Sequence, residues 1–205
     1  MKRINAGMLL SAYAQGIFPM AASRASGALN WYQPDPRGII PLDRFHAPRR
    51  LLRTMRTALA EGRISFSVNK AFGTVMRECA APRPGHPDTW INDEILALYG
   101  ALHAAGHAHS VEVWHGDQLA GGLYGVSLGA AFFGESMFSR MRHASKMALV
   151  FLVERLKAHG YMLLDTQFLT PHLAQFGAME ISNADYQVLL ADAISREARF
   201  SGGQS

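Results

Sequence analysis

The alternation of apolar and polar residues along the chain predicts a mixture of helices and strands. In the first half, apolar positions recur at helical spacing in four segments and at period two in shorter ones. The predicted helices span residues 5–15, 47–60, 69–79 and 92–106, and the predicted strands span 39–42 and 64–68. Asn69 and Asn92 are the expected N-caps of the last two helices, since Asn is a preferred capping residue. Segments 21–30 and 81–88 are rich in small residues or proline and are predicted to be loops.

The second half predicts a more regular order of elements. Residues 110–114, 119–127 and 131–135 have the pattern of a strand meander with glycines at its turns. Residues 144–159 form the clearest helix, and because it is apolar on nearly all sides we expect it to be buried. The remaining predictions are a strand over 161–168, a helix over 172–176, a strand over 179–181, a helix over 184–194 and a frayed tail over 201–205. This order predicts an α+β protein with an N-acetyltransferase-like (GNAT) mixed sheet flanked by helices.

A soft boundary between two units is predicted near residue 35. The run Pro34-Asp35-Pro36 has the composition of a linker. The predicted units are a small N-terminal one, residues 1–35, and a larger domain, residues 36–205. A chain of 205 residues is long enough for one substantial core and a small appendage.

Composition indicates a folded globular protein, since 49% of the residues are hydrophobic and 18% are charged. No apolar run approaches the roughly 20 residues that cross a bilayer, and the N-terminus shows no clear signal-peptide cleavage site. The one cysteine, Cys79, excludes an internal disulfide and fits a reducing compartment. We therefore expect a cytoplasmic protein that does not associate with membranes.

The net charge of +4 is too small to indicate a polyanion partner unless it is concentrated. It is concentrated in residues 49–56. In a helix, Arg49, Arg53 and Arg56 share one face at i, i+4 and i+7. The other face of that helix carries the apolar residues Leu52, Met55 and Leu59. The three guanidinium groups could follow phosphates, or they could form an ordinary solvated face, and the pattern alone leaves both interpretations open.

The candidate chemistry lies in two motifs near the end of the meander and of the following strand. Glu135 stands in the otherwise apolar run 132–140, where an unpaired carboxylate would be costly to bury. A structural salt bridge to Arg140 or Lys146 is the alternative to a functional role. Asp165 and Gln167 lie two residues apart, so their side chains should share a face of the strand. The alternative for Asp165 is a carboxylate that caps a turn at the strand end.

These motifs, FFGESMFSR, ASK and LLDTQ, resemble the leucyl/phenylalanyl-tRNA protein transferase family. Further family motifs recur in order along nearly the whole chain: AYAQGIFPM at 12–20, PDPR at 34–37, TWI at 89–91 and AHSVEVW at 108–114. The resemblance implies an enzyme that moves Leu or Phe from aminoacyl-tRNA to the N-terminal Arg or Lys of a protein and so marks it for N-end rule degradation. No cofactor is implied, because the aminoacyl ester is already activated.

The resemblance also implies residue roles. Asp165 and Gln167 match the acid and amide that handle the acceptor amine, and Glu135 is expected to meet the acceptor's cationic N-terminus or the aminoacyl-adenosine end. The arginine helix is where such enzymes are thought to meet the tRNA acceptor stem. Thr166 stands where the family commonly has Cys, which argues against a thiol intermediate, and Met20 stands where some relatives carry Trp.

An apolar donor needs an apolar pocket, and an unpaired adenine needs aromatic planes. Gly134 should let the substrate backbone approach closely. The expected walls and contacts of the pocket are Leu123, Phe132, Met137, Ser139, Leu149 and Leu164. The expected residues around the terminal adenosine are Trp90, Tyr99, Met20 and, from the N-terminal unit, Tyr13. Because apolar pockets discriminate by only about 1–3 kcal/mol per methylene, some transfer of Met is expected.

Two other functions and two other kinds of site are suggested by parts of the sequence. An acyl-CoA N-acetyltransferase predicts a glycine-rich loop before the central helix, yet no Gly occurs between 135 and 159. A non-catalytic RNA-binding module gives no reason for acids beside an apolar pocket. His103, His107 and His109 lack a Cys or carboxylate that completes a metal set, and Ser136 lacks the second glycine of a nucleophile elbow. We expect no metal and a monomer. The central prediction is that Glu135 and Asp165 converge at the mouth of one apolar cavity.

Overall fold

The structure, a computed structural model, describes residues 4–82 and 87–200. The predicted tail 201–205 and part of the predicted loop 81–88 lie outside these residues. The helices are α1 (Ala6–Tyr13), α2 (Arg49–Ala60), α3 (Phe72–Cys79), α4 (Asp93–Ala104), α5 (Ala144–Ala158), α6 (Pro171–Ala174) and α7 (Asn183–Ile194). The strands are β1 (Phe18–Ala21), β2 (Leu29–Tyr32), β3 (Arg37–Ile40), β4 (Ser65–Val68), β5 (Ala108–His115), β6 (Gln118–Leu128), β7 (Ala131–Ser139), β8 (Leu163–Gln167) and β9 (Met179–Ile181).

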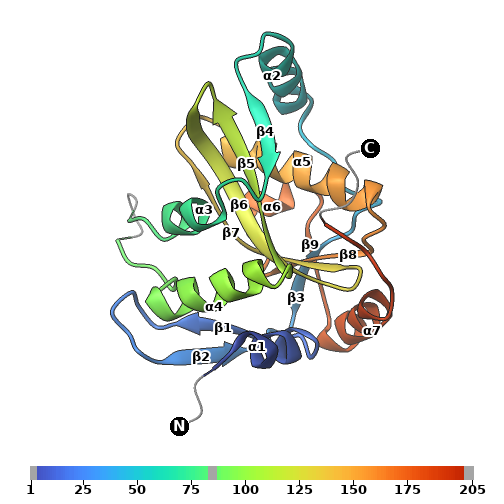
Figure 1. Cartoon of the computed structure of the whole chain (residues 1–205). Coiled ribbons are helices and arrows are strands. Elements are labelled where there is room, and N and C mark those ends of the chain that lie inside the picture. The colour runs from blue at the N-terminus through green and yellow to red at the C-terminus, as the bar shows by residue number, and fades with distance from the viewer. Residues whose placement is uncertain (1–3, 83–86, 201–205) are drawn as a thin grey trace.

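A seven-stranded mixed sheet forms the centre of the molecule (Figure 1). Its strand order is β4-β5-β6-β7-β8-β3-β9, and β1 pairs with β2 in a separate two-stranded sheet. All neighbours in the large sheet are antiparallel except β7 and β8, which run parallel. The helix α5 is the crossover that a parallel pair requires.

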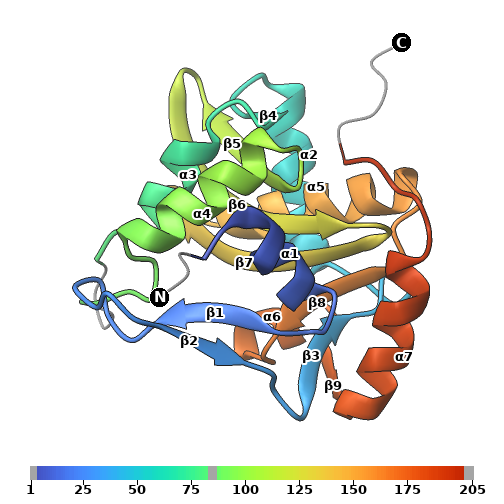
Figure 2. The same ribbon diagram turned by 60° about the horizontal axis from the view of Figure 1, so that its bottom comes forward.

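Helices cover both faces of the large sheet, so each face has its own core. The helices α1, α3, α4 and α7 contribute buried residues to one cluster with the sheet, and α2, α5 and α6 contribute to the other (Figure 2). In the first cluster, Leu9 and Tyr13 of α1 and Phe18 of β1 pack together with residues of α3 and α4. The predicted α+β class, a mixed sheet flanked by helices, is confirmed. In the described part of the chain, no helix is long and apolar enough to cross a membrane.

Most predicted elements are present, but three details of the prediction are wrong. Residues 21–30 were predicted to be a loop, yet their ends belong to the β1–β2 hairpin, whose short second strand is mostly exposed and so lacks an apolar pattern. The helix after Asn69 begins at Phe72, because Asn69 adopts φ of 61° and its side chain accepts from the Ser110 N–H. In α2, Leu51 is buried while Leu59 is 39% exposed, so the apolar face is rotated from the predicted one.

Asn92 does cap α4, as predicted, since its side chain accepts a hydrogen bond from the Ile95 N–H. The strand meander, the buried helix α5 and the order of all later elements also agree with the sequence pattern.

The parallel pair β7 and β8 is short, and this positions the site. The strands are paired only from Ala131–Leu163 to Phe133–Asp165. Beyond Phe133, β7 continues along β6 to Ser139, whereas β8 continues along β3. The two strands therefore separate at the carboxyl end of the parallel pair, where α/β proteins commonly bind ligands.

Candidate active site

A cavity of about 810 Å³ lies where β7 and β8 separate, a volume within the usual range for ligand sites. Residues 134–139 of β7 and the following Arg140 line one side, and residues 164, 166 and 167 of β8 and the following Phe168 line another. The N-terminal hairpin contributes Phe18 and Met20, and α5 and α6 contribute Ser145, Leu149, Leu152, His172 and Leu173. The lining is mainly apolar, with a few polar atoms among the side chains.

Glu135 enters this cavity from a β-bulge. Gly134 pairs with Gly125 of β6 and Ser136 pairs with Tyr124, so Glu135 between them is the extra residue. A bulge redirects a side chain relative to the regular alternation of a strand. Gly134 also lines the cavity, and a Cβ there would meet the Asp165 backbone oxygen at 3.5 Å, an ordinary contact. Packing within the protein therefore does not require a glycine at this position, and the residue borders the cavity.

Two tyrosines hold the carboxyl group of Glu135. Tyr13 of α1 donates to Oε1 at 2.6 Å, and Tyr99 of α4 donates to Oε2 at 3.2 Å. Both tyrosines are fully buried, and neither lines the cavity. The prediction that they stack on the terminal adenosine is therefore wrong, because their rings belong to the core and their hydroxyl groups are directed at Glu135.

The alternative role for Glu135, a salt bridge to Arg140 or Lys146, is not present. Arg140 pairs with Glu78 of α3, and Lys146 donates to Gln175. Burial is the largest influence on Glu135 and raises its pKa, the two tyrosine hydrogen bonds lower it, and the charge of Asp165 raises it again. The result is a pKa of about 7, well above the 4.5 of an exposed glutamate. Glu135 is thus a carboxyl group that titrates near neutral pH.

Asp165 has a different environment. Its carboxylate is fully buried and receives a bidentate hydrogen bond from Arg37 at 3.0 and 2.6 Å, together with one from the Tyr186 hydroxyl at 2.7 Å. Arg37 is also fully buried and donates to the Gly16 carbonyl. Asp165 does not line the cavity. The predicted convergence of two carboxylates at the cavity mouth is therefore wrong, because Arg37 binds the second carboxylate within the core.

Gln167 does line the cavity, and Asp165 helps to hold it there. The backbone N–H of Gln167 donates to Asp165 Oδ1 at 2.8 Å, and Gln167 adopts φ of 58°. The register shift between β3 and β8 makes Thr166 an extra residue, so the predicted common face of Asp165 and Gln167 is lost. Asp165 therefore contacts the backbone of Gln167 rather than its side-chain amide.

Several buried polar atoms of the cavity wall have no partner among the described residues. They are the Tyr124 hydroxyl, Thr166 Oγ1, Gln167 Nε2 and His172 Nε2, and all four residues line the cavity. Because a buried polar group without a partner costs about 1–3 kcal/mol, a native protein rarely keeps several in one place without a use. Their clustering in one largely apolar cavity indicates a binding site with a small number of specific polar contacts.

Most of the predicted substrate contacts lie together around this cavity. Those that line it are Met20, Trp90, Leu123, Gly134, Met137, Ser139, Leu149 and Leu164. Phe132 does not line it, although it lies on the same face of the sheet as Leu164: it is fully buried in the core and stacks on Phe200, with ring centroids 5.1 Å apart. Strand alternation places Phe132 and Leu164 on one face but does not show which of them reaches the cavity.

Sequence reasoning missed the residues that support the site. Arg37 is part of the PDPR motif, and a charged residue directly before the apolar run Gly38-Ile39-Ile40 was the available signal for it. Tyr186 had no comparable signal, since its partner Asp165 lies 21 residues away in the sequence. Phe18, Leu152 and Phe168 also line the cavity and were not predicted.

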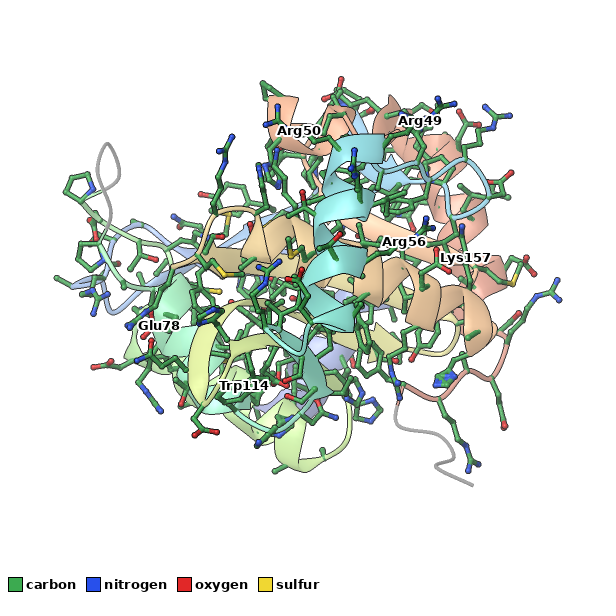
Figure 3. All side chains as sticks on the ribbon, turned by 90° about the horizontal axis from the view of Figure 1, so that it is seen from above. Arg49, Arg50, Arg56, Glu78, Trp114 and Lys157 are labelled. Carbon is green, nitrogen blue, oxygen red and sulfur yellow. The ribbon has the colours of Figure 1, made fainter. Side chains whose placement is uncertain are left out.

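The predicted arginines of α2 are exposed, and Arg50 joins them (Figure 3). The helix lies over α5, on the side of the sheet opposite α1 and α4. Burial lowers the pKa of His143, the N-cap of α5, and the charges of Arg142, Lys146 and, least, Arg50 lower it further. The basic surface of α2 thus extends toward the start of α5, where Ser145 lines the cavity.

The three histidines whose spacing could suggest a metal site, His103, His107 and His109, contact backbone atoms or Asn69. Nδ1 of His103 lies 2.8 Å from the Ala108 carbonyl, and Nδ1 of His109 lies 3.0 Å from Asn69 Nδ2. Across residues 4–82 and 87–200, no group of three His, Cys, Asp or Glu side chains is arranged to hold a metal ion.

Comparisons with known proteins match nearly the whole chain. The family model described as "Leucyl/phenylalanyl-tRNA protein transferase" matches residues 39–191, and one described as the N-terminal domain of that transferase matches residues 3–35. A Caulobacter vibrioides (strain NA1000 / CB15N) protein named leucyl/phenylalanyl-tRNA–protein transferase is 59% identical over 194 residues, 95% of this chain and 88% of the relative. A Maricaulis maris protein of the same name is 54% identical over 201 residues, 98% of this chain and 91% of the relative.

Solved structures resemble this one only distantly. L-PGS from Bacillus licheniformis gives a TM-score of 0.48 at 12% identity, over 95% of this chain and 72% of that one. FemX gives a TM-score of 0.49 at 14% identity, over 78% of this chain and 59% of that one. Both TM-scores lie below 0.5, so neither likeness assigns a fold family or an activity.

Proposed function

The chain belongs to the leucyl/phenylalanyl-tRNA protein transferase family, and we propose that it moves Leu and Phe from aminoacyl-tRNA to the N-terminal Arg or Lys of acceptor proteins. As a member it is an aminoacyltransferase that takes its donor from tRNA and transfers it to proteins. The observation that supports the finer proposal most directly is one apolar cavity that contains unpartnered polar atoms and one titratable carboxyl group.

The donor side chain fits the apolar part of the cavity. Leu123 of β6, Leu149 and Leu152 of α5 and Leu164 of β8 surround a region without charges, and unbranched Met137 can adapt to either Leu or Phe. Such walls exclude charged side chains by desolvation and discriminate weakly among apolar ones. Transfer of Met at a lower rate follows from the same walls.

The terminal adenosine is proposed to lie at the hairpin end of the cavity. Trp90 and Phe18 offer aromatic surfaces there, and Met20 offers a thioether. Stacking on an aromatic side chain contributes about 1–3 kcal/mol per base. Residues 1–35 would thus act as a small N-terminal unit that completes the adenosine site, beside a GNAT-like catalytic domain of residues 36–205.

Gln167 and Thr166 are proposed to polarise the ester carbonyl. Both place an unpartnered hydrogen-bond donor on the cavity wall, and donors aimed at a developing oxyanion stabilise the transition state of acyl transfer. Asp165 is then a positioning residue, because it holds the Gln167 backbone and does not reach the substrate.

The α2 arginines are proposed to contact the tRNA acceptor stem. Replacing Arg49, Arg53 and Arg56 by Ala should weaken tRNA binding and reduce the slope of log K against log salt by about 0.9 for each lost phosphate contact. The measurement is a filter-binding titration at several salt concentrations, and an unchanged slope would remove α2 from the interface. Replacement of exposed Arg196, which pairs with Asp192 on α7, is the matched control.

An acceptor that begins with Arg or Lys carries two positive groups. Glu135 and Glu78 are the carboxylates that line the cavity, and Glu78 is paired with Arg140. We propose that these two acids favour a cationic N-terminus, and that the modified proteins enter N-end rule degradation in the cytoplasm. The enzyme is proposed to act as a monomer and without a cofactor.

The test incubates the protein with radiolabelled Leu-tRNA, Phe-tRNA or acetyl-CoA and a peptide that begins with Arg. Label should enter the peptide from either aminoacyl-tRNA, and a matched peptide that begins with Glu should remain unlabelled. Label from acetyl-CoA alone would overturn the proposal in favour of an acetyltransferase. Binding of tRNA without any transfer would favour the RNA-binding module.

A further inference from the structure

Three oxygen-bearing groups from distant parts of the chain meet below the bulge of β7. They are the carboxyl group of Glu135 and the hydroxyls of Tyr13 on α1 and Tyr99 on α4. Each hydroxyl contacts one carboxyl oxygen, and the two hydroxyls also contact each other. Of the three residues, only Glu135 lines the cavity. The cluster therefore connects a buried hydrogen-bond network to the substrate site through one carboxyl group.

The number of protons in this cluster follows from its three contacts. Each hydrogen bond needs one proton between its two oxygens. The two phenols supply two, and both keep them at neutral pH, because burial raises the pKa of Tyr13 and of Tyr99 well above the usual value. When Glu135 itself carries a proton, it donates to one phenol and that phenol donates to the other, so all three contacts contain a proton. The arrangement in the structure is thus complete with a protonated Glu135, and one contact must loosen when Glu135 ionises.

The charges around Glu135 leave it without a permanent counter-ion. Tyr124 of β6, Asp165 of β8 and Arg37 of β3 are the other titratable groups whose charges interact with Glu135. Arg37 is committed to Asp165 by a bidentate contact, so its charge is largely balanced there. Within the described residues, Glu135 has no salt bridge. A positive group that enters the cavity would therefore be the first to meet this carboxylate directly.

On the basis of the proposed function, we propose that Glu135 is the base that takes a proton from the acceptor's α-ammonium group. Tyr13 and Tyr99 are then positioning residues that share this proton. The acceptor amine must be neutral to act as a nucleophile, and at neutral pH most of it arrives protonated. The pKa of Glu135, about 7, lies close to the roughly 7.7–8.0 of an α-amino group, so little free energy opposes the transfer.

The step balances in atoms and charge. One N–H bond of the ammonium group breaks, and its proton binds the Glu135 carboxylate. The freed lone pair attacks the ester carbonyl carbon, the C–N bond forms, and the bond from that carbon to the ribose 3′-oxygen breaks. The 3′-oxygen leaves with a second proton from the amine nitrogen, and Glu135 returns its proton to water. One ester and one ammonium group yield an amide, a 3′-hydroxyl and one free proton.

The test measures single-turnover transfer from Phe-tRNA to a peptide that begins with Arg, from about pH 5 to about pH 9. Glu135→Gln should lower the rate by about 10²–10⁴-fold, the usual contribution of a general base, and should remove the part of the rise with pH that comes from Glu135. Tyr13→Phe and Tyr99→Phe should each move that rise to higher pH, because each removes a donor that stabilises the ionised carboxylate. The acceptor's own titration is common to all variants and so cancels in the comparison.

Tyr161→Phe is the matched control. Tyr161 is a buried tyrosine with one side-chain partner, Ser127, and it does not line the cavity, so its replacement should leave the pH profile in place. A Glu135→Gln rate within about threefold of the original would overturn the inference, since a general base contributes far more, and so would tyrosine variants with an unmoved profile. If a tyrosine variant does not fold, the pH titration of the Glu135 carboxyl is followed by its ¹³C signal in the unmodified protein. Titration at the ordinary pKa of glutamate would also overturn the inference. Failure of the unmodified protein to transfer any label would instead refute the proposed function.

Discussion

Glu135 and Asp165 are carboxyl groups in one molecule, on neighbouring strands, with opposite relations to their surroundings. Asp165 is fully buried against a guanidinium group and a phenol, whereas Glu135 meets two phenols and no cation. A buried carboxylate with a bidentate Arg partner has a counter-ion within the core and serves the fold. A buried carboxyl group that has only neutral donors can gain or lose a proton near neutral pH. Asp165, paired with Arg37, therefore supports the fold, whereas Glu135 is the group that is available for chemistry.

The largest effect on stability should come from breaking the ion pair between Arg37 and Asp165. Arg37→Met leaves the Asp165 charge buried without a counter-ion, which typically costs about 3–5 kcal/mol of stability. Urea unfolding of the variant measures this loss. Arg63→Met, which removes an exposed pair with Glu61, should change stability by no more than about 1 kcal/mol.

A double variant separates the loss of charge balance from the loss of packing. Arg37→Met combined with Asp165→Asn removes both charges, so it should recover part of the stability that Arg37→Met loses. If Arg37→Met were as stable as the Arg63→Met control, the assignment of Asp165 to the scaffold would be wrong.

The sequence predicts the scaffold better than it predicts the site. Helix α5 and the meander were predictable because their apolar periods are long and are not interrupted. The bulges at Glu135 and Thr166 were not predictable from the sequence. One extra residue reverses which side chains face the cavity, but it does not change the composition of the strand. Alternation with period two alone therefore predicts that Asp165 and Gln167 share a face of the strand. In the structure the extra residue Thr166 changes this, and Asp165 lies in the core.

The partners of the two acids were equally hidden from local patterns. Tyr13 contacts Tyr99 across 86 residues and Glu135 across 122, and Arg37 contacts Asp165 across 128. The family motifs contain both acids, but motifs do not show which side chains meet. Sequence alone consequently predicts the two tyrosines as stacking surfaces, and only their contacts in the structure identify them as hydrogen-bond donors to Glu135.

The second effect is a dependence of stability on pH that comes from Glu135. Its pKa is about 7 in the folded protein and 4.5 in the reference state, so the folded chain binds this proton more tightly than the unfolded chain does. Its contribution is therefore fully present below about pH 4.5 and is lost as the pH rises through about 7. At 1.36 kcal/mol per unit, the shift of about 2.5 units corresponds to roughly 3 kcal/mol.

Glu135→Gln tests this linkage, because an amide does not titrate. The difference in unfolding free energy between Glu135→Gln and the unmodified protein should grow in favour of the variant from about pH 5 to about pH 8. Urea unfolding at each pH gives the two curves. Parallel curves would mean that Glu135 does not hold its proton in the folded state, and the contrast with Asp165 would then disappear.

The smallest effect compares one phenol from each network. Tyr186→Phe removes a donor from Asp165, and Tyr13→Phe removes one from Glu135. A hydrogen bond to a charged group contributes about 1.5–3 kcal/mol, and one between neutral groups contributes about 0.5–1.5 kcal/mol. At about pH 5 Glu135 is protonated, so Tyr13→Phe should cost less than Tyr186→Phe. At about pH 8 Glu135 is ionised, and the cost of Tyr13→Phe should rise toward that of Tyr186→Phe. Urea unfolding of both variants at the two pH values decides the matter, and equal costs at about pH 5 would show that Glu135 and Asp165 carry the same charge after all.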